Sequence, residues 1–483
     1  MKKLLSLAAL LAGLSMNGVA KDGYKIQLKF NDVRDSAFFL AHYFAKPLPT
    51  IYKTDSGKLD KTGLSVLKSD QKITGGMYII MLSDRKTYFE FLLNNGDDLV
   101  INVPNSKTLP QGLTIKNSVE NDAFIKYEEF VHTVGEEHQE LSKKLATAKN
   151  SVDSAAIKDK MTAKMKSLID YRNDFSAKNP NSLLAKIFKG LDLPKVPEGK
   201  HFLPNGEEDK DYAYRYYKSH YWDNFDLKDG RMINTPMYDA RLSEYFEKLV
   251  LPSTDSMIKE ADWILTQSRG SGDLFNYTLS WLANYSQESK VMGMDRVYVY
   301  LVDHYYAKGD AAWLSNDLLQ KHLDHARELS PTLIGNMGYD ITMKDTSGKK
   351  DITVSNIKSK YKLIVMWEPT CGHCMKEVPA MDSTYKAAKL KDRGVKIIGI
   401  CGEDAPQAWK DFIKKHNLSE WTHIYDPEHK SNYKAWYNVR SFPTMYVLDE
   451  KGIIRGKSID HSNIVSLIDM LERQDADKKK NSK

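Results

Sequence analysis

The junction between two predicted elements reads Trp367-Glu368-Pro369-Thr370-Cys371-Gly372-His373-Cys374. A short apolar run precedes it at residues 363–367 and predicts a buried strand, and a pattern of helical spacing follows it to about residue 390. Two cysteines separated by two residues at such a junction favour dithiol–disulfide chemistry. This stretch therefore indicates an α/β domain that carries a redox site.

Strands and helices alternate on both sides of this motif. We expect further strands at 395–400, 444–448 and 453–456, and further helices at 406–416 and 462–473. The resulting order β-α-β-α-β-β-α, over about 140 residues, predicts an α/β thioredoxin-like fold for residues 331–475.

The rest of the chain divides where the hydrophobic period changes. Alternating or short apolar runs between turn residues predict a small antiparallel β-domain over residues 21–118. Stripes of helical spacing, punctuated by prolines, predict a helical region over residues 119–330. A polar tail, residues 476–483, follows the α/β domain. The chain is thus expected to be a multidomain α+β protein.

The composition excludes several classes of protein. The 483 residues suggest roughly three domains at about 150 residues each. A hydrophobic content of 41 % is enough to build cores, which excludes wholesale disorder. Because 70 Lys and Arg stand against 64 Asp and Glu, with no basic block interleaved with aromatics, we expect no nucleic-acid partner. The three cysteines exclude a disulfide-stapled scaffold.

The first 20 residues have the layout of a secretory signal peptide. Lys2 and Lys3 form a basic start, Leu4–Leu14 an apolar run, and Gly18-Val19-Ala20 a small-residue end. The apolar run has about eleven residues, whereas a membrane span needs about 20. We therefore expect cleavage at the end of this segment and a mature protein without stable membrane insertion. Its expected location is the periplasm or cell envelope, where disulfide exchange is possible.

The positions of the two cysteines predict different roles. At a helix N-terminus, unpaired backbone N–H groups and the helix dipole stabilise a thiolate on Cys371. Cys374 lies almost one turn further along, where it can attack a mixed disulfide held on Cys371. His373 adds a positive charge that favours the reduced form and makes the couple more oxidising. We expect a nucleophile and a resolving thiol that need no metal or organic cofactor.

Three other interpretations of the motif make different demands. A zinc site needs more ligands, and the chain has no second Cys-x-x-Cys. A c-type haem needs a histidine directly after the second cysteine, where Met375 stands. A passive structural disulfide stays open, although so small a loop constrains the unfolded chain very little.

The residues around the motif resemble a known family. The pattern Cys-x-x-Cys-x-x-Glu-x-Pro over residues 371–379 is similar to that of TlpA/ResA-type thioredoxin-like proteins of bacterial envelopes, in the redoxin or AhpC/TSA-like superfamily. The segment at residues 437–444 resembles the one that leads into the family's cis-proline. The resemblance covers roughly residues 333–473. The whole layout is similar, more loosely, to multidomain thiol–disulfide oxidoreductases of Bacteroides-like bacteria.

The resemblance implies roles for further residues. Pro443 is the implied cis-proline, and the backbone of Phe442 is implied to pair with an incoming chain. Glu377 is implied to assist proton transfer at the buried thiol, with an exposed surface carboxylate as the alternative. Trp367 and His373 are expected to contact substrates.

Two positions depart from the patterns of related proteins. Val365 stands where thioredoxins proper carry a buried Asp, and Glu368 stands where a small residue is common, which alters the field at Cys371. The resemblance also implies envelope protein thiols and disulfides as substrates, and a membrane electron donor of the DsbD/CcdA type as a partner. We therefore predict a periplasmic thiol–disulfide oxidoreductase, with the direction of electron flow left open.

Other candidate residues have ordinary structural interpretations. Cys401 follows a strand and is expected to be a semi-buried thiol, and His322 and His325 are expected to be solvated helix residues. Seven aromatic residues between positions 212 and 225 predict packing between helices, with a stacking platform for a sugar or peptide as the alternative.

Two alternative functions belong to other classes. In one, residues 21–330 form an envelope ligand-binding or scaffold protein to which a redox module is appended. In the other, the chain is a thiol peroxidase, although the Pro-x-x-x-Thr-x-x-Cys pattern of a peroxidatic cysteine is missing at Cys371.

Overall fold

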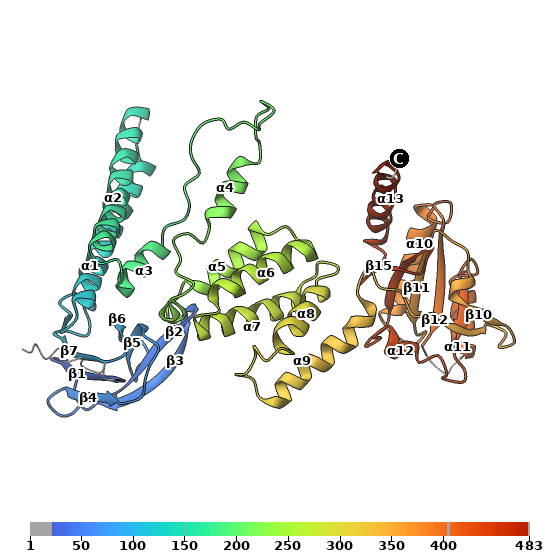
Figure 1. Ribbon diagram of the computed structural model, residues 1–483. Coiled ribbons are helices and arrows are strands. Elements are labelled where there is room, and N and C mark those ends of the chain that lie inside the picture. Colours follow the sequence, from blue (N-terminus) through green and yellow to red (C-terminus); the bar gives the residue numbers. More distant parts are fainter. Residues whose placement is uncertain (1–21, 149, 403–405, 482–483) are drawn as a thin grey trace, which may run out of the picture. The chain divides into compact units, whose positions relative to one another are not determined.

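The computed structural model describes residues 22–148, 150–402 and 406–481 (Figure 1). The predicted signal peptide, residues 1–20, lies outside the described residues.

Two compact units make up the chain. The first ends at Leu249 and also includes Gln267–Phe275. The second consists of Val250–Thr266 and the residues from Asn276 onward. The β-rich region and the first helices therefore belong to one compact unit, and the last helices belong to the same unit as the α/β domain.

The first unit begins with two four-stranded sheets, ordered β4-β1-β7-β8 and β3-β2-β5-β6. The predicted antiparallel β-domain is confirmed, with one parallel pair, β1 with β7. This pair is parallel because the chain builds the other sheet between these two strands, which allows a long crossover. The strands are β1 (Tyr24–Phe30), β2 (Ala37–Phe44), β3 (Lys46–Lys58), β4 (Leu64–Ser69), β5 (Gly76–Leu82), β6 (Tyr88–Leu93), β7 (Asp97–Val103) and β8 (Thr114–Lys116).

Alternation along the strands builds a core between these two sheets. In β1 every second side chain is buried, and Ile26 and Leu28 are completely inaccessible. They belong to one cluster with Leu40 of β2 and Phe91 of β6. Each such side chain contributes about 1.5–3 kcal/mol by leaving water, so this core is the main force that closes the sandwich.

A helical region follows the sheets, as predicted, and starts with a long antiparallel hairpin. Ser118 and Asn150 cap its two helices by accepting hydrogen bonds from the backbone N–H groups of Asn121 and Asp153. The elements are α1 (Val119–Ala146), α2 (Ser151–Lys178), α3 (Leu183–Gly190), α4 (Tyr212–His220), η1 (Gly230–Asn234), α5 (Tyr238–Glu244), η2 (Tyr245–Leu249), α6 (Thr254–Ser268), α7 (Gly272–Glu288), α8 (Asp295–Leu301), η3 (Val302–Tyr306), α9 (Asn316–Leu329) and η4 (Ser330–Thr332).

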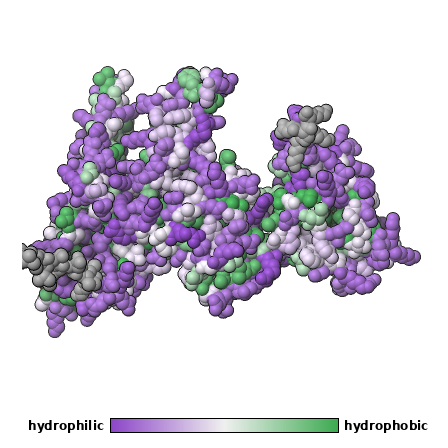
Figure 2. Space-filling view, viewed as in Figure 1, coloured by the Kyte–Doolittle hydropathy of each residue, from purple (hydrophilic) through white to green (hydrophobic). Residues whose placement is uncertain are grey.

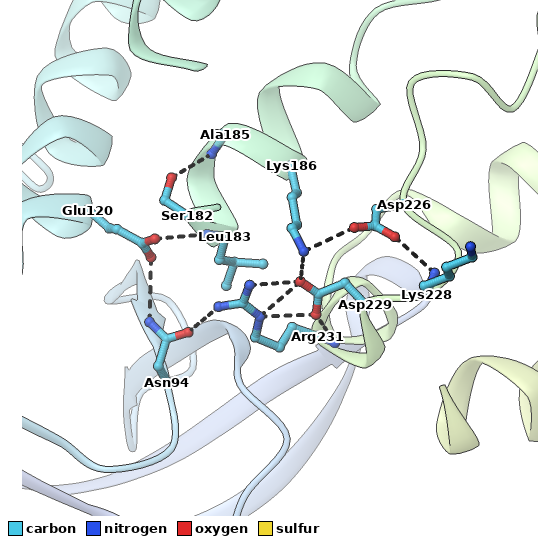
Figure 3. Close-up of polar contacts among 10 residues, drawn as sticks. All are labelled: Asn94, Glu120, Ser182, Leu183, Ala185, Lys186, Asp226, Lys228, Asp229 and Arg231. Carbon is cyan, nitrogen blue, oxygen red and sulfur yellow. Dashed lines mark hydrogen bonds and ion pairs between the residues drawn. The ribbon is translucent and has the colours of Figure 1, made fainter. Parts of the chain in front are cut away.

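A network of charged side chains joins the sheets of the first unit to its helices (Figure 3). Arg231 of η1 donates to the carboxylate of Asp229 at 2.7–3.2 Å and to Oδ1 of Asn94, in the β6–β7 turn, at 2.8 Å. Lys186 of α3 lies 2.6 Å from the same carboxylate and 3.0 Å from Asp226. We call these five residues the Arg231 cluster.

The charges of the Arg231 cluster act strongly on Asp229. Burial alone raises the pKa of the Asp229 carboxyl, but hydrogen bonds from Arg231 and Lys186 outweigh it and hold the pKa well below its ordinary value. Glu120 of α1 extends the network to the start of α3, where it accepts a hydrogen bond from the backbone N–H of Leu183 at 2.8 Å. The network therefore ties the β6–β7 turn, α3 and η1 together (Figure 3).

The second unit ends in a seven-stranded sheet of order β10-β9-β13-β12-β11-β14-β15. β11 pairs in parallel with β12 and antiparallel with β14, and β12 pairs in parallel with β13. The predicted thioredoxin-like fold is confirmed by this mixed sheet and its helices (Figure 1). The elements are β9 (Thr342–Asp345), β10 (Asp351–Thr353), η5 (Val354–Asn356), β11 (Tyr361–Trp367), α10 (Cys374–Ala387), β12 (Val395–Cys401), α11 (Pro406–Lys415), β13 (Thr422–Tyr425), α12 (Tyr433–Trp436), β14 (Thr444–Asp449), β15 (Ile454–Lys457) and α13 (Ile464–Asn481).

The central strand β11 serves two cores. Leu363, Val365 and Trp367 belong to a cluster that includes side chains of α10 and α13. Ile364 and Met366 belong to the cluster on the other face of the sheet. Because successive side chains of a strand point to opposite faces, a strand covered on both faces reads as a continuous apolar run.

Three strands of this sheet, β9, β10 and β13, were absent from the predicted order. They are only three or four residues long, and a period of two cannot be recognised in so few positions. β9 pairs antiparallel with β13 and with β10, so the three strands extend the sheet beyond β12.

The face shown in Figure 2 is dominated by hydrophilic residues, with apolar residues in small groups between them. Within the ranges that the structure describes, no helix combines the length and the apolar composition needed to cross a bilayer.

Candidate active site

The two cysteines of the motif lie between the end of β11 and the first turn of α10. The helix begins at Cys374, so Cys371 lies in the turn just before it, whereas the prediction made Cys371 the N-terminal residue of the helix. The backbone N–H of Cys371 donates to the carbonyl of Glu368 at 3.3 Å, and its own carbonyl accepts the N–H of Met375 at 3.0 Å. Cys371 is therefore still joined to the helix start by a backbone hydrogen bond.

The Cys371 thiol lies between two backbone groups. Its S–H donates to the carbonyl oxygen of Phe442 at 3.3 Å, and its Sγ accepts the N–H of Cys374 at 3.4 Å. An N–H at a helix start stabilises a negative charge on the sulfur that accepts it. The side chain is also partly exposed, so a second molecule can reach it.

Cys374 has the opposite environment. Its side chain is completely buried, and burial is the main reason why the pKa of its thiol is raised to about 12. Interactions with Cys371 and the charge of Glu368 raise this pKa further, whereas the backbone N–H of Glu368 lowers it. At neutral pH this thiol is protonated, so any attack by Cys374 requires that its proton be removed.

The loop that faces Cys371 is held by its neighbours. The Phe442–Pro443 peptide bond is cis, and the loop leads into β14. A Cβ atom at Gly402, directly after β12, would lie only 2.5 Å from Cζ of Phe442. The ammonium of Lys434 lies 5.4 Å from the centre of the Phe442 ring and donates to the Gly402 carbonyl at 2.9 Å. These contacts hold the Phe442 ring against Gly402 and Lys434, while the Phe442 carbonyl contacts Cys371.

Trp367 and His373, which the sequence predicts to contact substrates, differ in access. Trp367 is fully buried, and its ring lies 4.9 Å from that of Phe412. Trp367 is the last residue of β11, and its side chain packs in the core between the sheet and the helices α10 and α13. His373 is exposed and precedes α10 as the cap residue, without a capping hydrogen bond from its side chain.

Glu377 of α10 is bound to the loop before α13. Its Oε1 accepts the backbone N–H of His461 at 2.5 Å, and its Oε2 lies 2.8 Å from Nδ1 of the same histidine. The carboxylate whose charge acts on Cys374 is that of Glu368. The structure therefore places Glu377 in the site region but directs its carboxylate to His461.

Three polar residues at the ends of β11 and β12 and in α12 form a group that was not predicted as part of the site. A Cβ atom at Gly402 would lie 2.8 Å from Cγ and 2.9 Å from Oε1 of Glu368, so the Glu368 side chain packs against this glycine. The buried hydroxyl of Tyr433 has no hydrogen-bond partner among the described residues. Burial raises its pKa, and the charges of Cys401 and Glu368 add to this effect. We call Glu368, Cys401 and Tyr433 the Glu368 group.

Only Glu368 had a signal in the sequence that pointed to the dithiol, since Cys401 was predicted only as a semi-buried thiol. Glu368 departs from the small residue that is common at its position, and this departure pointed to an altered local field. Tyr433 and Cys401 come from α12 and from the end of β12, and no local pattern links these segments to the motif.

The remaining candidates contact neighbouring side chains. The hydroxyl of Tyr298 lies 2.9 Å from Nδ1 of His322, and burial lowers the pKa of both His322 and His325. No cluster of three metal-ligating side chains occurs in the described part of the chain. In the aromatic cluster, Tyr221 and Trp222 are buried and stack edge to face with ring centres 5.3 Å apart.

Parts of the chain are similar to known families and proteins. Residues 334–457 match the AhpC/TSA family, and residues 150–328 match a domain of unknown function, DUF5106. The chain is 31 % identical over 121 residues to the thioredoxin-like protein YneN of Bacillus subtilis (strain 168), which covers 25 % of this chain and 68 % of YneN. It is 29 % identical over 126 residues to the thiol-disulfide oxidoreductase ResA of Bacillus cereus, which covers 26 % of this chain and 69 % of ResA.

A solved structure is similar over a longer part of the chain. It is a thioredoxin-like protein from Bacteroides caccae ATCC 43185, which is 17 % identical. The match covers 58 % of this chain and 98 % of that protein, with a TM-score of 0.44.

Proposed function

The chain belongs to the thioredoxin-like thiol–disulfide oxidoreductases of the AhpC/TSA family, and we propose that it exchanges disulfides with proteins of the cell envelope through Cys371 and Cys374. The observation that carries this proposal is the asymmetry of the two thiols. Cys371 is partly exposed and accepts a backbone N–H, whereas Cys374 is buried and protonated directly behind it.

This asymmetry supports a two-step exchange. The Cys371 thiolate attacks a substrate disulfide, forms a mixed disulfide and releases one substrate sulfur as a thiolate. The Cys374 thiolate then attacks Sγ of Cys371, which forms the Cys371–Cys374 disulfide and releases the second substrate sulfur. The substrate gains two electrons and the protein dithiol loses two. In the reverse direction the same steps oxidise a substrate dithiol.

The neighbouring loop fits a polypeptide substrate. The carbonyl of Phe442 meets Cys371, and the loop continues into β14. We propose that the backbone of Phe442 pairs with the substrate chain while Pro443 shapes the loop and the exposed His373 contacts the substrate from the side of α10.

We place the protein in the periplasm or cell envelope, on the basis of the predicted signal peptide at residues 1–20. A membrane electron donor of the DsbD/CcdA type is the partner proposed to recycle the dithiol. No metal or organic cofactor has a part in the exchange.

Insulin reduction by the full chain tests this function. Wild-type protein should precipitate the insulin B chain in the presence of dithiothreitol, and Cys371→Ser should abolish this activity. Cys374→Ser should instead accumulate mixed disulfides with envelope proteins, because the resolving thiol is missing. Wild-type protein that is inactive, together with a Cys374→Ser variant that traps nothing, would contradict the proposal and favour a ligand-binding role for residues 21–330.

The redox potential decides the direction of exchange. Equilibration of the dithiol with glutathione should give a reduction potential of about −270 mV for a reductase and about −120 mV for an oxidase. His373 favours the oxidising end, whereas the resemblance to ResA favours the reducing end.

A further inference from the structure

We propose that Arg440 is a positioning residue for disulfide exchange, because its contacts with α9 hold the loop that presents the backbone of Phe442 to a protein substrate. This inference rests on the proposed function and assigns part of its substrate binding to the helical region. It makes α9 a support of the active site, although this helix lies outside residues 334–457, which match the AhpC/TSA family.

The loop in question, residues 438–443, connects α12 to β14 and contacts the nucleophile. The carbonyl of Phe442 accepts the S–H of Cys371 at 3.3 Å. Near the start of the loop, the backbone N–H of Val439 donates to the carbonyl of Lys434 at 2.8 Å. This second contact is local in the sequence, so it shapes the start of the loop and leaves the position of its middle to other contacts.

Arg440, two residues before Phe442, joins the middle of the loop to α9. Its Nη2 lies 3.1 Å from Nδ1 of His325 and is paired with the carboxylate of Glu328, which lie 115 and 112 positions earlier in the chain. Its Nε donates to Oδ1 of Asn438 at 3.1 Å. A guanidinium only donates, so Nδ1 of His325 is the acceptor. Arg440 therefore ties the loop to two residues one turn apart on α9.

The His325 ring is itself held in place. Its centre lies 5.3 Å from that of Tyr298, a buried residue of α8 whose hydroxyl lies 2.9 Å from Nδ1 of His322. Burial and the charge of Arg440 lower the pKa of His325 and outweigh the opposite effect of Glu328. At neutral pH the ring is therefore mostly neutral, which is the form that accepts a hydrogen bond from a guanidinium.

Other contacts join these helices to the sheet of the α/β domain. Lys457 of β15 lies 2.5 Å from the carboxylate of Asp295, in α8, and donates to the carbonyl of Thr332 at 3.2 Å. The side chains of Lys457 and Asp295 are only 14 % and 18 % exposed. The backbone N–H of Gly335 donates to the carbonyl of Ile454 at 2.8 Å. Because these contacts lie on both sides of α9 in the sequence, the helix is a fixed anchor for the loop.

The pair of Arg440 and Glu328 is placed for orientation more than for stability. Their side chains are 59 % and 55 % exposed, and so exposed an ion pair contributes little to the stability of the fold. A peptide that pairs with the backbone of Phe442 needs N–H and C=O groups in defined directions, so a loop that is not held binds it more weakly. Loss of Arg440 should therefore weaken the binding of a polypeptide and leave the thiol chemistry unchanged.

Two disulfides of different size separate these effects. Insulin reduction by the full chain over a range of insulin concentrations gives kcat and KM, and 5,5′-dithiobis(2-nitrobenzoate) reports the reactivity of Cys371. Arg440→Gln should raise the KM for insulin by about fivefold with little change in kcat, as expected for the loss of one net polar interaction in binding. Its reaction with the small disulfide should stay unchanged, because this reagent has no backbone to pair with Phe442.

Charge reversal tests whether α9 is the anchor. Glu328→Arg brings two cations together and should raise the KM for insulin at least as much as Arg440→Gln does. Arg440→Glu combined with Glu328→Arg restores an ion pair of opposite polarity and should return the KM part of the way to wild type, which also guards against a folding defect. Arg327→Gln is the matched control. Arg327 is bound to Asp324 of the same helix at 2.6 Å, so its loss should leave both reactions unchanged.

Three results would contradict the inference. An unchanged KM in Arg440→Gln, or a double variant no better than Glu328→Arg, means that the contact does not position the loop. An equal loss of reaction with the small disulfide means that Arg440 acts on the thiols and not on substrate binding. Wild-type protein that reacts with neither disulfide contradicts the proposed function, and the inference with it.

Discussion

The Arg231 cluster and the dithiol site differ in whether their buried polar groups are paired. In the Arg231 cluster the cations of Arg231 and Lys186 face the carboxylates of Asp229 and Asp226, and Asn94 accepts a further hydrogen bond (Figure 3). At the dithiol site a protonated thiol is completely buried, and the hydroxyl of Tyr433 has no hydrogen-bond partner among the described residues.

The difference separates stability from chemistry. A network in which opposite charges are paired has one favourable arrangement, and to break any part of it leaves an uncompensated charge. A buried thiol that is neutral at rest and ionises during the exchange is not held by such ion pairs, so it can react without breaking them. The variants and measurements below test this contrast.

The largest expected effect is the difference in alkylation between the two cysteines. A thiol with a pKa of about 12 is ionised in only about one molecule in ten thousand at pH 8. Iodoacetamide should therefore label Cys371 at least about 100-fold faster than Cys374, and faster than an unstructured cysteine peptide at neutral pH. Mass spectrometry of timed digests measures both rates. Equal labelling of the two thiols would remove the asymmetry on which the function rests.

The next largest effect is expected from the loss of a cation in the Arg231 cluster. Arg231→Met leaves Asp229, whose side chain is only 10 % exposed, without its bidentate partner. The free energy of unfolding of the first unit should fall by about 2–4 kcal/mol, since Arg231 itself is partly exposed. Urea denaturation followed by hydrogen exchange in the first unit measures it. Lys228→Met, at an exposed neighbouring position, is the control and should change stability by less than about 0.5 kcal/mol. Disulfide exchange should be unaffected in both variants.

The pH dependence of the same cluster gives a third test. The folded protein holds the pKa of Asp229 below its unfolded value of 3.8, so its stabilisation is complete above that pH and is lost as the pH falls further. Asp229→Asn should lower the free energy of unfolding by about 1–3 kcal/mol at neutral pH. Its difference from wild type should shrink progressively below about pH 4. Asp223→Asn, at an exposed site, should show no such trend. A constant difference at all pH values would show that the charge of Asp229 is not what stabilises the cluster.

The smallest effects concern two glycines with different surroundings. A Cβ atom at Gly402 would collide with Phe442 and Glu368, so Gly402→Ala should destabilise the second unit by about 1–2 kcal/mol and disturb disulfide exchange. Gly135 lies within α1 and nothing approaches its Cβ position, so Gly135→Ala should stabilise the first unit by about 0.5–1 kcal/mol. Thermal unfolding and insulin reduction of both variants test the pair. Opposite signs are expected for their stability changes, and a stabilising Gly402→Ala would mean that the site is not closely packed.

Much of the fold was predictable because its signals are local. The apolar run that became β11, the helical stripes of the middle region and the alternation of β1 each act through neighbouring residues, so a short window contains the whole pattern. The short strands β9 and β13 escaped prediction because they are defined by pairing with distant strands and not by their own period.

The same distinction applies to the candidate site. The Cys-x-x-Cys motif and its place between strand and helix follow from local sequence, since the spacing of two thiols within one helical turn is a local property. The environments of the thiols do not, because burial depends on which segments close over the motif. Glu377 binds His461, which lies 84 positions later in the sequence. The Cys371 thiol binds the carbonyl of Phe442, which lies 71 positions later. The distances between such residues cannot be read from a linear sequence, because only chain folding brings the Phe442 carbonyl to the sulfur of Cys371 and the Phe442 ring to Gly402.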